Sequence, residues 1–275
     1  MRQTRGAIVC PSCERLISAQ EKKCPFCGTW QPGMFGFGPA LSRAIGGKLD
    51  LSNAITVTCA ALYVLSLATD PGALLRFSGI FDLFAPSGQA LFRLGMTGGY
   101  AMALGQWWTL CTAVFLHGSV LHILFNLVIM RRYLPMVTDL YGNARGFVIF
   151  MAAGIGGYVL SNALGGSNTI GASGSIFGLL GALICYGRRT GQSYITNQLW
   201  MSALMMLVMS FLMGGHVNNW AHAGGFIGGY LAAQVMPTTH RREGPGLMLL
   251  AGALALVTVA GFALSFVGFA PATAH

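Results

Sequence analysis

The charged residues of this chain are separated by long stretches that carry no charge, and these stretches constrain the fold more than any other feature. Only 8% of the residues are charged, against roughly 25% in an average soluble domain, while 54% are hydrophobic. So few charges cannot cover the surface of a soluble protein, and so apolar a chain is not a disordered one. The composition therefore excludes an ordinary soluble enzyme and predicts an all-α polytopic membrane protein.

The charge-free stretches predict the number of membrane spans, because one span needs about 20 predominantly apolar residues. They have room for seven, which we place at 52–69, 108–130, 146–164, 173–187, 198–214, 221–236 and 246–267. The 39 glycines follow no three-residue repeat, and they favour closely packed membrane helices. We expect Asp139 to lie in the loop after the second span.

The basic residues predict the orientation in the membrane. If the N-terminus is cytoplasmic, every Lys and Arg except Arg76 and Arg93 lies on the cytoplasmic side, as the positive-inside rule requires. We therefore expect a multi-pass protein, which we assign to a bacterial cell (inner) membrane, with its C-terminus external. No cleavable signal peptide is expected, because residues 1–30 contain no apolar core. The net charge of +9 reflects topology, and no nucleic-acid partner is expected.

Four cysteines near the N-terminus form two CxxC pairs: Cys10 with Cys13, and Cys24 with Cys27. Each pair can present two thiolates from one turn, and two such turns complete a tetrahedral zinc site. The alternative is a pair of disulfides, which requires an oxidising compartment that the charge asymmetry opposes. We predict one structural zinc in a zinc-ribbon-like module over residues 1–30, followed by a Gly-rich linker over residues 31–50.

Three polar groups lie within the predicted spans, where polar side chains are costly and often functional. His122 and Asn126 are four residues apart and share one helix face. Ser173 lies among small residues at the start of a span, and His222 is followed by glycines at three and seven positions. Each group alone is also explained by close packing or hydrogen bonding between helices.

Taken together, the three groups supply the parts that acyl transfer requires. A Ser hydroxyl needs a base, a neutral His can serve near pH 7, and the tetrahedral intermediate needs fixed donors for its oxyanion. Asp139 is the only acidic residue between Trp107 and Met236, so the spans in between offer no carboxylate for an aspartyl protease or a proton relay. We expect catalysis to need no cofactor.

At these residues the chain resembles the rhomboid family of intramembrane serine proteases, over about residues 55–233. Three motifs occur in the family's order: HxxxN at His122 and Asn126, GxSG at Ser173, and AHxxGxxxG at His222. The resemblance implies a catalytic dyad of Ser173 and His222. It also implies oxyanion donors at His122, Asn126 and the Ser173 backbone N–H.

The resemblance implies roles for other parts of the chain. Phe177 takes the place of the aromatic that packs against the catalytic His, and His117 that of a structural His in the first external loop. Residues 51–240 resemble the six-helix protease core, and residues 241–275 the additional helix and tail of the 6+1 subgroup. Trp108 matches a Trp-Arg pair in that loop, but Thr109 replaces the Arg, so we expect the loop to be supported differently.

Two other readings stay open beside the protease. A membrane adaptor or chaperone that binds transmembrane clients without cutting them is favoured by Thr109, but the intact Ser173 and His222 oppose it. A small-solute transporter is opposed by the absence of internal repeats and of a buried charge. The sequence thus predicts an intramembrane serine endopeptidase whose substrates are single-span membrane proteins in the lipid bilayer.

Overall fold

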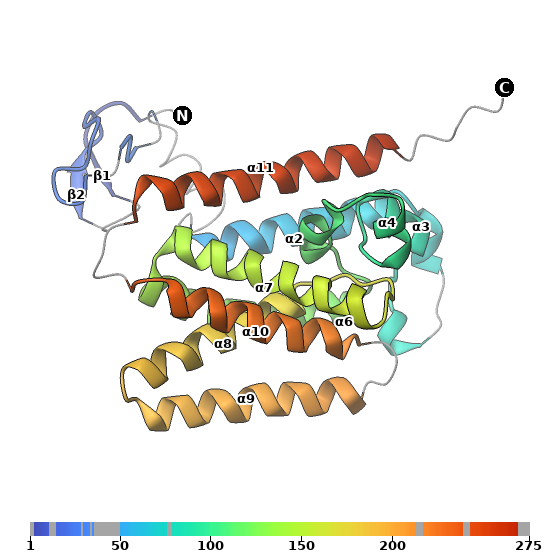
Figure 1. Ribbon diagram of the computed structural model, residues 1–275. Coiled ribbons are helices and arrows are strands. Elements are labelled where there is room, and N and C mark those ends of the chain that lie inside the picture. The colour runs from blue at the N-terminus through green and yellow to red at the C-terminus, as the bar shows by residue number, and fades with distance from the viewer. Residues whose placement is uncertain are drawn as a thin grey trace. The chain divides into compact units, whose positions relative to one another are not determined.

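The computed structural model (Figure 1) describes residues 3–10, 15–28, 30–33, 35, 50–75, 79–212, 217–238 and 243–268. The chain divides into two compact units, Met1–Ala54 and Ile55–His275. The first contains a small sheet, and the second contains the bundle of long helices.

The first unit contains two short antiparallel strands, β1 (Ala7–Val9) and β2 (Leu16–Ser18), in which Ile8 lies opposite Ile17. Only the central residue of each strand is buried, as the alternation of a strand dictates. The two isoleucines form a small core with Cys10 and Cys24. A core of this size is too small to stabilise a fold alone, so such units usually need a metal or disulfides.

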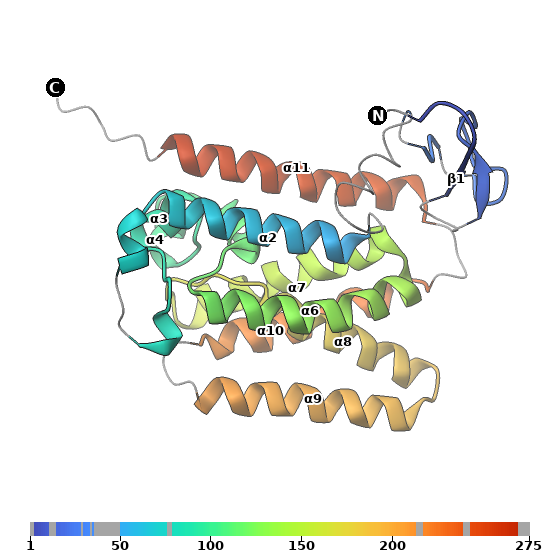
Figure 2. The same cartoon turned by 180° about the vertical axis from the view of Figure 1, so that it is seen from behind.

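Seven helices of the second unit correspond to the predicted spans, although the first four residues of the first helix belong to the other unit. They are α2 (Leu51–Ala68), α6 (Val120–Tyr141), α7 (Asn143–Leu164), α8 (Ser173–Arg189), α9 (Ser193–Leu212), α10 (Asn219–Val235) and α11 (Pro245–Gly268). Five of them, α2, α6, α7, α9 and α11, are long and apolar enough to cross a membrane. The other two have 17 residues each, or about 26 Å at 1.5 Å per residue. The chain is an integral multi-pass membrane protein, and Figure 2 shows the helices from behind.

A long segment of short helices connects α2 to α6. It comprises η2 (Pro71–Leu75), η3 (Ile80–Asp82), α3 (Gly88–Arg93), α4 (Gly99–Ala103), α5 (Thr109–Thr112) and η4 (Ala113–Phe115). We call residues 79–119 the first loop. It has a small apolar core of its own that includes Leu91, Phe92 and Leu116.

The predicted second span, 108–130, is wrong at both ends. The helix begins at Val120 because Ser119 caps it: the Ser119 backbone is extended, and its Oγ accepts a hydrogen bond from the His122 N–H at 3.2 Å. The helix runs past Arg131, whose long side chain is exposed and need not end a membrane helix. Asp139 accordingly lies in the last turn of α6 and not in a loop. The other six spans agree with the helices to within about five residues, an ordinary boundary error.

Glycines allow α10 to pack closely against α8. A Cβ atom on Gly225 or Gly229 would lie less than 3.0 Å from the backbone of Gly174 or Gly178, respectively. In a membrane, burial of apolar surface does not drive helices together, so close approach through small residues takes its place. The contact brings the first turns of α8 and α10 together.

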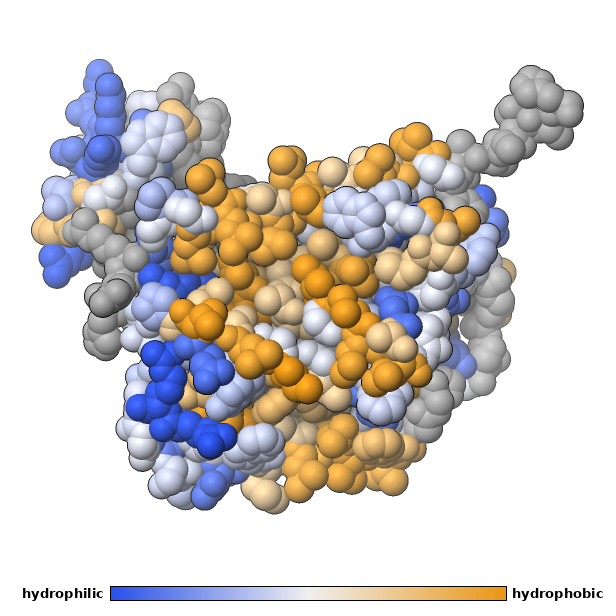
Figure 3. All heavy atoms as spheres, viewed as in Figure 1, coloured by the Kyte–Doolittle hydropathy of each residue, from blue (hydrophilic) through white to orange (hydrophobic). Residues whose placement is uncertain are grey.

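The outer surface of the bundle is apolar, as contact with lipid tails requires. Figure 3 shows orange side chains along α9, α10 and α11, with more polar atoms toward the ends of the helices. The exposed large side chains on these helices include Leu204, Val208, Ile227, Leu231, Leu256 and Val259. The surface confirms the prediction of a membrane-embedded bundle.

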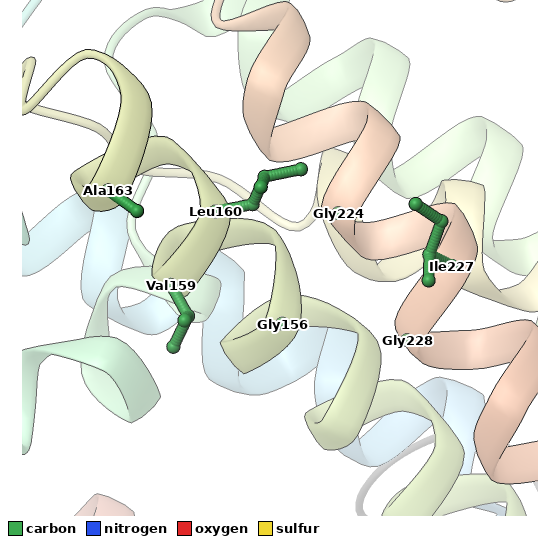
Figure 4. Close-up of a pocket in the computed structure, with 7 residues that line it drawn as sticks. All are labelled: Gly156, Val159, Leu160, Ala163, Gly224, Ile227 and Gly228. Atoms are coloured by element: carbon green, nitrogen blue, oxygen red, sulfur yellow. The ribbon is translucent and has the colours of Figure 1, made fainter.

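On its other side, α10 packs closely against α7. A Cβ atom on Gly224 would lie 2.7 Å from the carbonyl oxygen of Gly156. The outer side of this contact is an apolar groove of about 310 Å³ (Figure 4), lined by Gly156, Val159, Leu160, Ala163, Gly224, Ile227 and Gly228. Neither Ser173 nor His222 lines this groove.

The contact between α8 and α10 gives a testable prediction. Gly229→Ala should lower the free energy of unfolding by roughly 1–3 kcal/mol, because the added methyl group meets the Gly178 backbone. Gly252→Ala, on α11, is the matched control, since a Cβ atom there meets nothing within 4 Å. Thermal unfolding of both variants in the same detergent measures the difference. Equal stabilities would contradict the packing described.

Candidate active site

The structure brings Ser173 and His222 into contact. Ser173 is the first residue of α8, and His222 lies in the first turn of α10. The His222 Nε2 is 2.9 Å from the Ser173 Oγ, a hydrogen-bond distance. His222 is 5% exposed and Ser173 is partly buried. The two residues are 49 positions apart and meet because Gly225 lets α10 approach the α8 backbone.

Stacking on an aromatic ring holds the His222 imidazole. The rings of Phe177 and His222 are 4.4 Å apart between centroids and inclined by 23°, so Phe177 packs against His222 as expected. The His222 Nδ1 is buried and has no hydrogen-bond partner among the residues that the structure describes. In the described part of the chain, therefore, Phe177 orients the ring where a serine protease triad uses a carboxylate.

His122 lies beside the residues that precede Ser173. The Gly118 N–H donates to the His122 Nδ1 at 3.2 Å, so in the neutral imidazole the proton is on Nε2. That Nε2 faces Gly171, where an added Cβ atom would lie only 2.6 Å from it. Gly171 also has a φ of +114°, which other residues rarely adopt. Both the close approach and the backbone conformation thus require glycine here.

Asn126 lies one turn further along α6, on the same face as His122. Its side chain is 6% exposed, and its Nδ2 donates to the His122 carbonyl oxygen at 2.8 Å. An amide nitrogen carries two hydrogens, so a second donor is left on Nδ2. His117 is 1% exposed and packs edge-on against the His122 ring, with centroids 5.1 Å apart. This placement agrees with a structural role for His117.

Hydrogen bonds from two directions hold the segment before Ser173. The Gly171 N–H donates to the Ala113 carbonyl oxygen of the first loop at 2.9 Å. The Tyr158 hydroxyl of α7 donates to the Gly171 carbonyl oxygen at 2.7 Å. Ser173 then begins α8, and the first N–H groups of a helix have no partner within the helix and lie at its positive end. The start of α8 can therefore bind negative charge.

Asn218 holds the start of α10, and sequence reasoning missed it. Its Oδ1 caps the helix by accepting from the Ala221 N–H at 3.2 Å. Its Nδ2 lies 2.6 Å from the Ser161 Oγ, 3.0 Å from the Ser167 Oγ and 2.8 Å from the Thr169 Oγ1. Asn218 thus ties the helix that carries His222 to α7 and to the segment before Ser173. The sequence offered one signal for this role, which is the preference of Asn for the N-cap position of a helix.

Three of the four predicted metal ligands cluster in the first unit. The Sγ atoms of Cys10, Cys24 and Cys27 all lie within 4.8 Å of one another, and Cys13 lies outside the described residues. The Cys10 and Cys27 Sγ atoms are 3.7 Å apart, too far for a disulfide of about 2.05 Å. Tetrahedral zinc with Zn–S bonds of about 2.3 Å separates its sulfur atoms by about 3.8 Å. The thiol cluster therefore fits a metal ion.

Comparison with known proteins identifies the helical part of the chain. A polytopic helical membrane protein with a Ser–His pair between two of its helices is the class that the fold and the site define. Residues 104–238 match the family model of the Rhomboid domain. The match covers just under half of the chain, and over these residues the chain is similar to the Rhomboid domain.

Several relatives share this similarity. The chain is 29% identical to Rhomboid protease GluP of Bacillus subtilis, over 63% of the chain and 34% of that protein. It is 29% identical to RHOMBOID-like protein 1 of Arabidopsis thaliana, over 65% of the chain and 51% of the relative. It is 30% identical to Rhomboid-like protease 1 of Toxoplasma gondii, over 53% of the chain and 52% of the relative. The matches thus span about a third to about half of the length of these relatives.

Variants of Asn218 test how the start of α10 is held. Asn218→Ala removes the cap and the donor, and should lower the free energy of unfolding by about 1–2 kcal/mol or more. Asn218→Asp keeps a cap acceptor but loses the donors to Ser161 and Thr169, so it should fall between wild type and Asn218→Ala. Thermal unfolding in detergent measures the order. An alanine variant as stable as the wild type would refute the role of Asn218.

Proposed function

We propose that the chain is an intramembrane serine endopeptidase that cleaves transmembrane segments with a dyad of Ser173 and His222. One observation carries the proposal: the 2.9 Å contact between the Ser173 Oγ and the His222 Nε2 within a Rhomboid domain. Relatives that carry the word protease in their names support the same reaction class.

Proton transfer between these two atoms starts the reaction. The His222 Nε2 accepts the proton of the Ser173 hydroxyl as the Oγ attacks the scissile carbonyl carbon. The imidazolium then gives the proton to the leaving amine, and an acyl-enzyme remains. Water deacylates it, with His222 again as the base. The stacked Phe177 ring keeps the imidazole aimed at the Ser173 Oγ throughout.

Donors around the attacked carbonyl stabilise the oxyanion. Ser173 contributes its backbone N–H at the positive end of α8. His122 contributes its Nε2–H, which is directed toward Gly171, and Asn126 contributes the second hydrogen of its Nδ2. All three donors are neutral and fixed before substrate arrives, so they need no carboxylate, metal or other cofactor for catalysis.

The substrate is a single-span membrane protein in the lipid bilayer. Ser173 and His222 lie among helices that are apolar on the outside, so a cleaved peptide bond reaches them from within the membrane. A peptide bond inside an intact helix is shielded by its own hydrogen bonds. The substrate helix must therefore unwind locally, and small or polar residues near the scissile bond make this easier.

The proposed arrangement in the membrane has the N-terminus in the cytoplasm and the C-terminus outside, in a bacterial cell membrane. The clustering of basic residues supports it. Residues 1–30 then form a cytoplasmic zinc module, residues 31–50 a linker, residues 51–240 the protease core, and residues 241–275 an additional helix and tail.

Loss of either dyad residue should abolish activity. Ser173→Ala and His222→Ala should each lower cleavage of a model transmembrane substrate in liposomes by at least about 10⁴-fold. Ser175→Ala is the matched control: Ser175 is also a buried serine of α8, its Oγ has no partner among the described residues, and its loss should leave cleavage intact. Wild-type-like cleavage by Ser173→Ala would refute the proposal.

Loss of one oxyanion donor should weaken catalysis without abolishing it. Asn126→Ala should lower kcat by roughly 10²–10³-fold, because the Ser173 N–H and His122 donors remain. A fluorophosphonate that labels Ser173 should still reach the same final extent at a lower rate. Complete loss of labelling in a folded Asn126→Ala protein would contradict this role.

The thiol cluster should bind one zinc ion per chain. Purified protein should contain about one equivalent, and Cys10→Ser combined with Cys24→Ser should lose it, since two thiolates cannot complete the site. Cleavage by the zinc-free variant should continue in detergent, because no metal takes part in the reaction. Elemental analysis measures the metal; two disulfides and no metal would exclude the site.

A further inference from the structure

The helix outside the six-helix core, α11, contacts the first loop through a specific hydrogen bond. The Trp108 Nε1–H donates to the Ser265 Oγ at 2.9 Å, across 157 residues of sequence. Ser265 is 3% exposed although it lies on the most apolar helix of the chain. A polar side chain on such a helix is costly unless it has a partner, and its partner here is the tryptophan of the first loop.

The backbone of α11 also lies close to side chains of the first loop. A Cβ atom on Gly261 would lie 3.0 Å from the Thr112 Cγ2 and 3.2 Å from the Trp108 Cβ. Phe262, the next residue, packs against the apolar core of the first loop. Gly261 and Ser265 lie one turn apart on α11, and the face that they share therefore packs against the first loop.

A short series of contacts continues from Trp108 to the nucleophile. The Trp108 carbonyl oxygen accepts from the Thr112 N–H at 3.2 Å, and Ala113 follows directly. The Ala113 carbonyl oxygen accepts from the Gly171 N–H at 2.9 Å, and Gly171 is two residues before Ser173. Displacement of Trp108 would therefore move the backbone acceptor that holds the segment before the nucleophile.

Thr109, the residue after Trp108, makes a separate set of contacts. It is fully buried, and its Oγ1 donates to the Gln106 carbonyl oxygen at 2.7 Å and lies 3.2 Å from the Thr97 Oγ1. The Thr97 carbonyl oxygen in turn accepts from the Thr169 N–H at 2.8 Å. The Thr109 hydroxyl contacts only residues of the first loop itself. A contact that holds the loop to a distant part of the chain must therefore come from another residue.

We propose that α11 is part of the catalytic scaffold, with Ser265 and Gly261 as positioning residues that hold the first loop against the segment before Ser173. The inference rests on the proposed function only where its test measures the rate of catalysis or of labelling. Its structural arm, the coupling of α11 to Gly171, can be measured without catalysis.

The hydrogen bond is tested by a pair of conservative variants. Ser265→Ala and Trp108→Phe should each slow fluorophosphonate labelling of Ser173 and lower kcat by about fivefold, the loss of one hydrogen bond, with KM unchanged. The double variant should lose no more than either single one, because both remove the same contact. Ser265→Thr keeps the hydroxyl and should restore the rate.

The matched control for the hydroxyl is Thr258→Val on the same helix. Thr258 is also buried, but its Oγ1 donates to the Leu254 carbonyl oxygen of its own helix at 2.8 Å, so its loss should not change the labelling rate. For the close approach, Gly261→Val should separate α11 from the first loop, whereas Gly252→Val, at an open position of α11, should not.

Hydrogen exchange supplies the structural arm. In wild type, the Gly171 amide is held by Ala113, so Gly261→Val and Ser265→Ala should accelerate its exchange, while Gly252→Val and Thr258→Val should not. Unchanged exchange at Gly171 would overturn the proposal, whatever the activity. A lower final extent of labelling at an unchanged rate would also overturn it, because that is the result of partial unfolding. If the variants show these exchange differences but the wild type shows no Ser173-dependent cleavage, the proposed function is refuted and the coupling of α11 to Gly171 stands.

Discussion

The close approach of α8 and α10 is the contact on which the candidate site depends. Ser173 and His222 lie on different helices, and their 2.9 Å separation exists only because the glycines at 225 and 229 let α10 meet the α8 backbone. Lipid tails are as apolar as the side chains between helices, so burial alone would not select this pairing. Backbone contact does select it, since any side chain at these positions would separate the helices. The same glycines that pack the bundle therefore set the distance between Ser173 and His222.

A polar site inside an apolar bundle needs an internal partner for nearly every donor and acceptor. Asn218 and Tyr158 meet this need with hydrogen bonds that also fix the segment between α7 and α8. His122 accepts a hydrogen bond from the Gly118 N–H of the first loop. Some buried atoms have no partner in the described part of the chain, among them the His222 Nδ1, the Asn126 Oδ1 and both ring nitrogens of His117. An unpaired imidazole N–H costs free energy, but a carboxylate partner would need desolvation in the same apolar surroundings. Stacking on Phe177 orients the ring without burying a charge.

The sequence predicted the parts of this protein whose signal is local, and it failed where tertiary contacts decide. Charge-free stretches located six of the seven long helices, because a membrane span must be apolar whatever it packs against. The same rule placed the second span wrongly, because the charge-free stretch begins after Arg93 in the first loop, and the Ser119 cap that starts α6 lies inside that stretch. The motif residues were singled out because Ser, His and Asn inside a membrane span are recognisable by type, and the structure brings Ser173 and His222 into contact. Asn218 and Tyr158 were missed because their roles arise from residues 49 to 57 positions away or from a neighbouring loop.

The support of the first loop near Thr109 also depends on tertiary contacts and on the cost of buried charge. A buried arginine, as in the family's usual Trp-Arg pair, would need several acceptors to offset its desolvation, and it would hold distant parts of the loop together through them. Thr109 avoids that desolvation cost, because its single hydroxyl donates to the nearby Gln106 carbonyl oxygen. Its side chain is too short to contact the distant parts of the loop that an arginine could contact. The loop of this chain is instead held from outside by α11, through Trp108 and Ser265. In a membrane, support by a packed helix costs less free energy than support by a buried arginine, because van der Waals contact is available there and a buried charge is expensive. The hydrogen bond from Trp108 to Ser265 thus connects the first loop to α11 without a charged side chain at position 109.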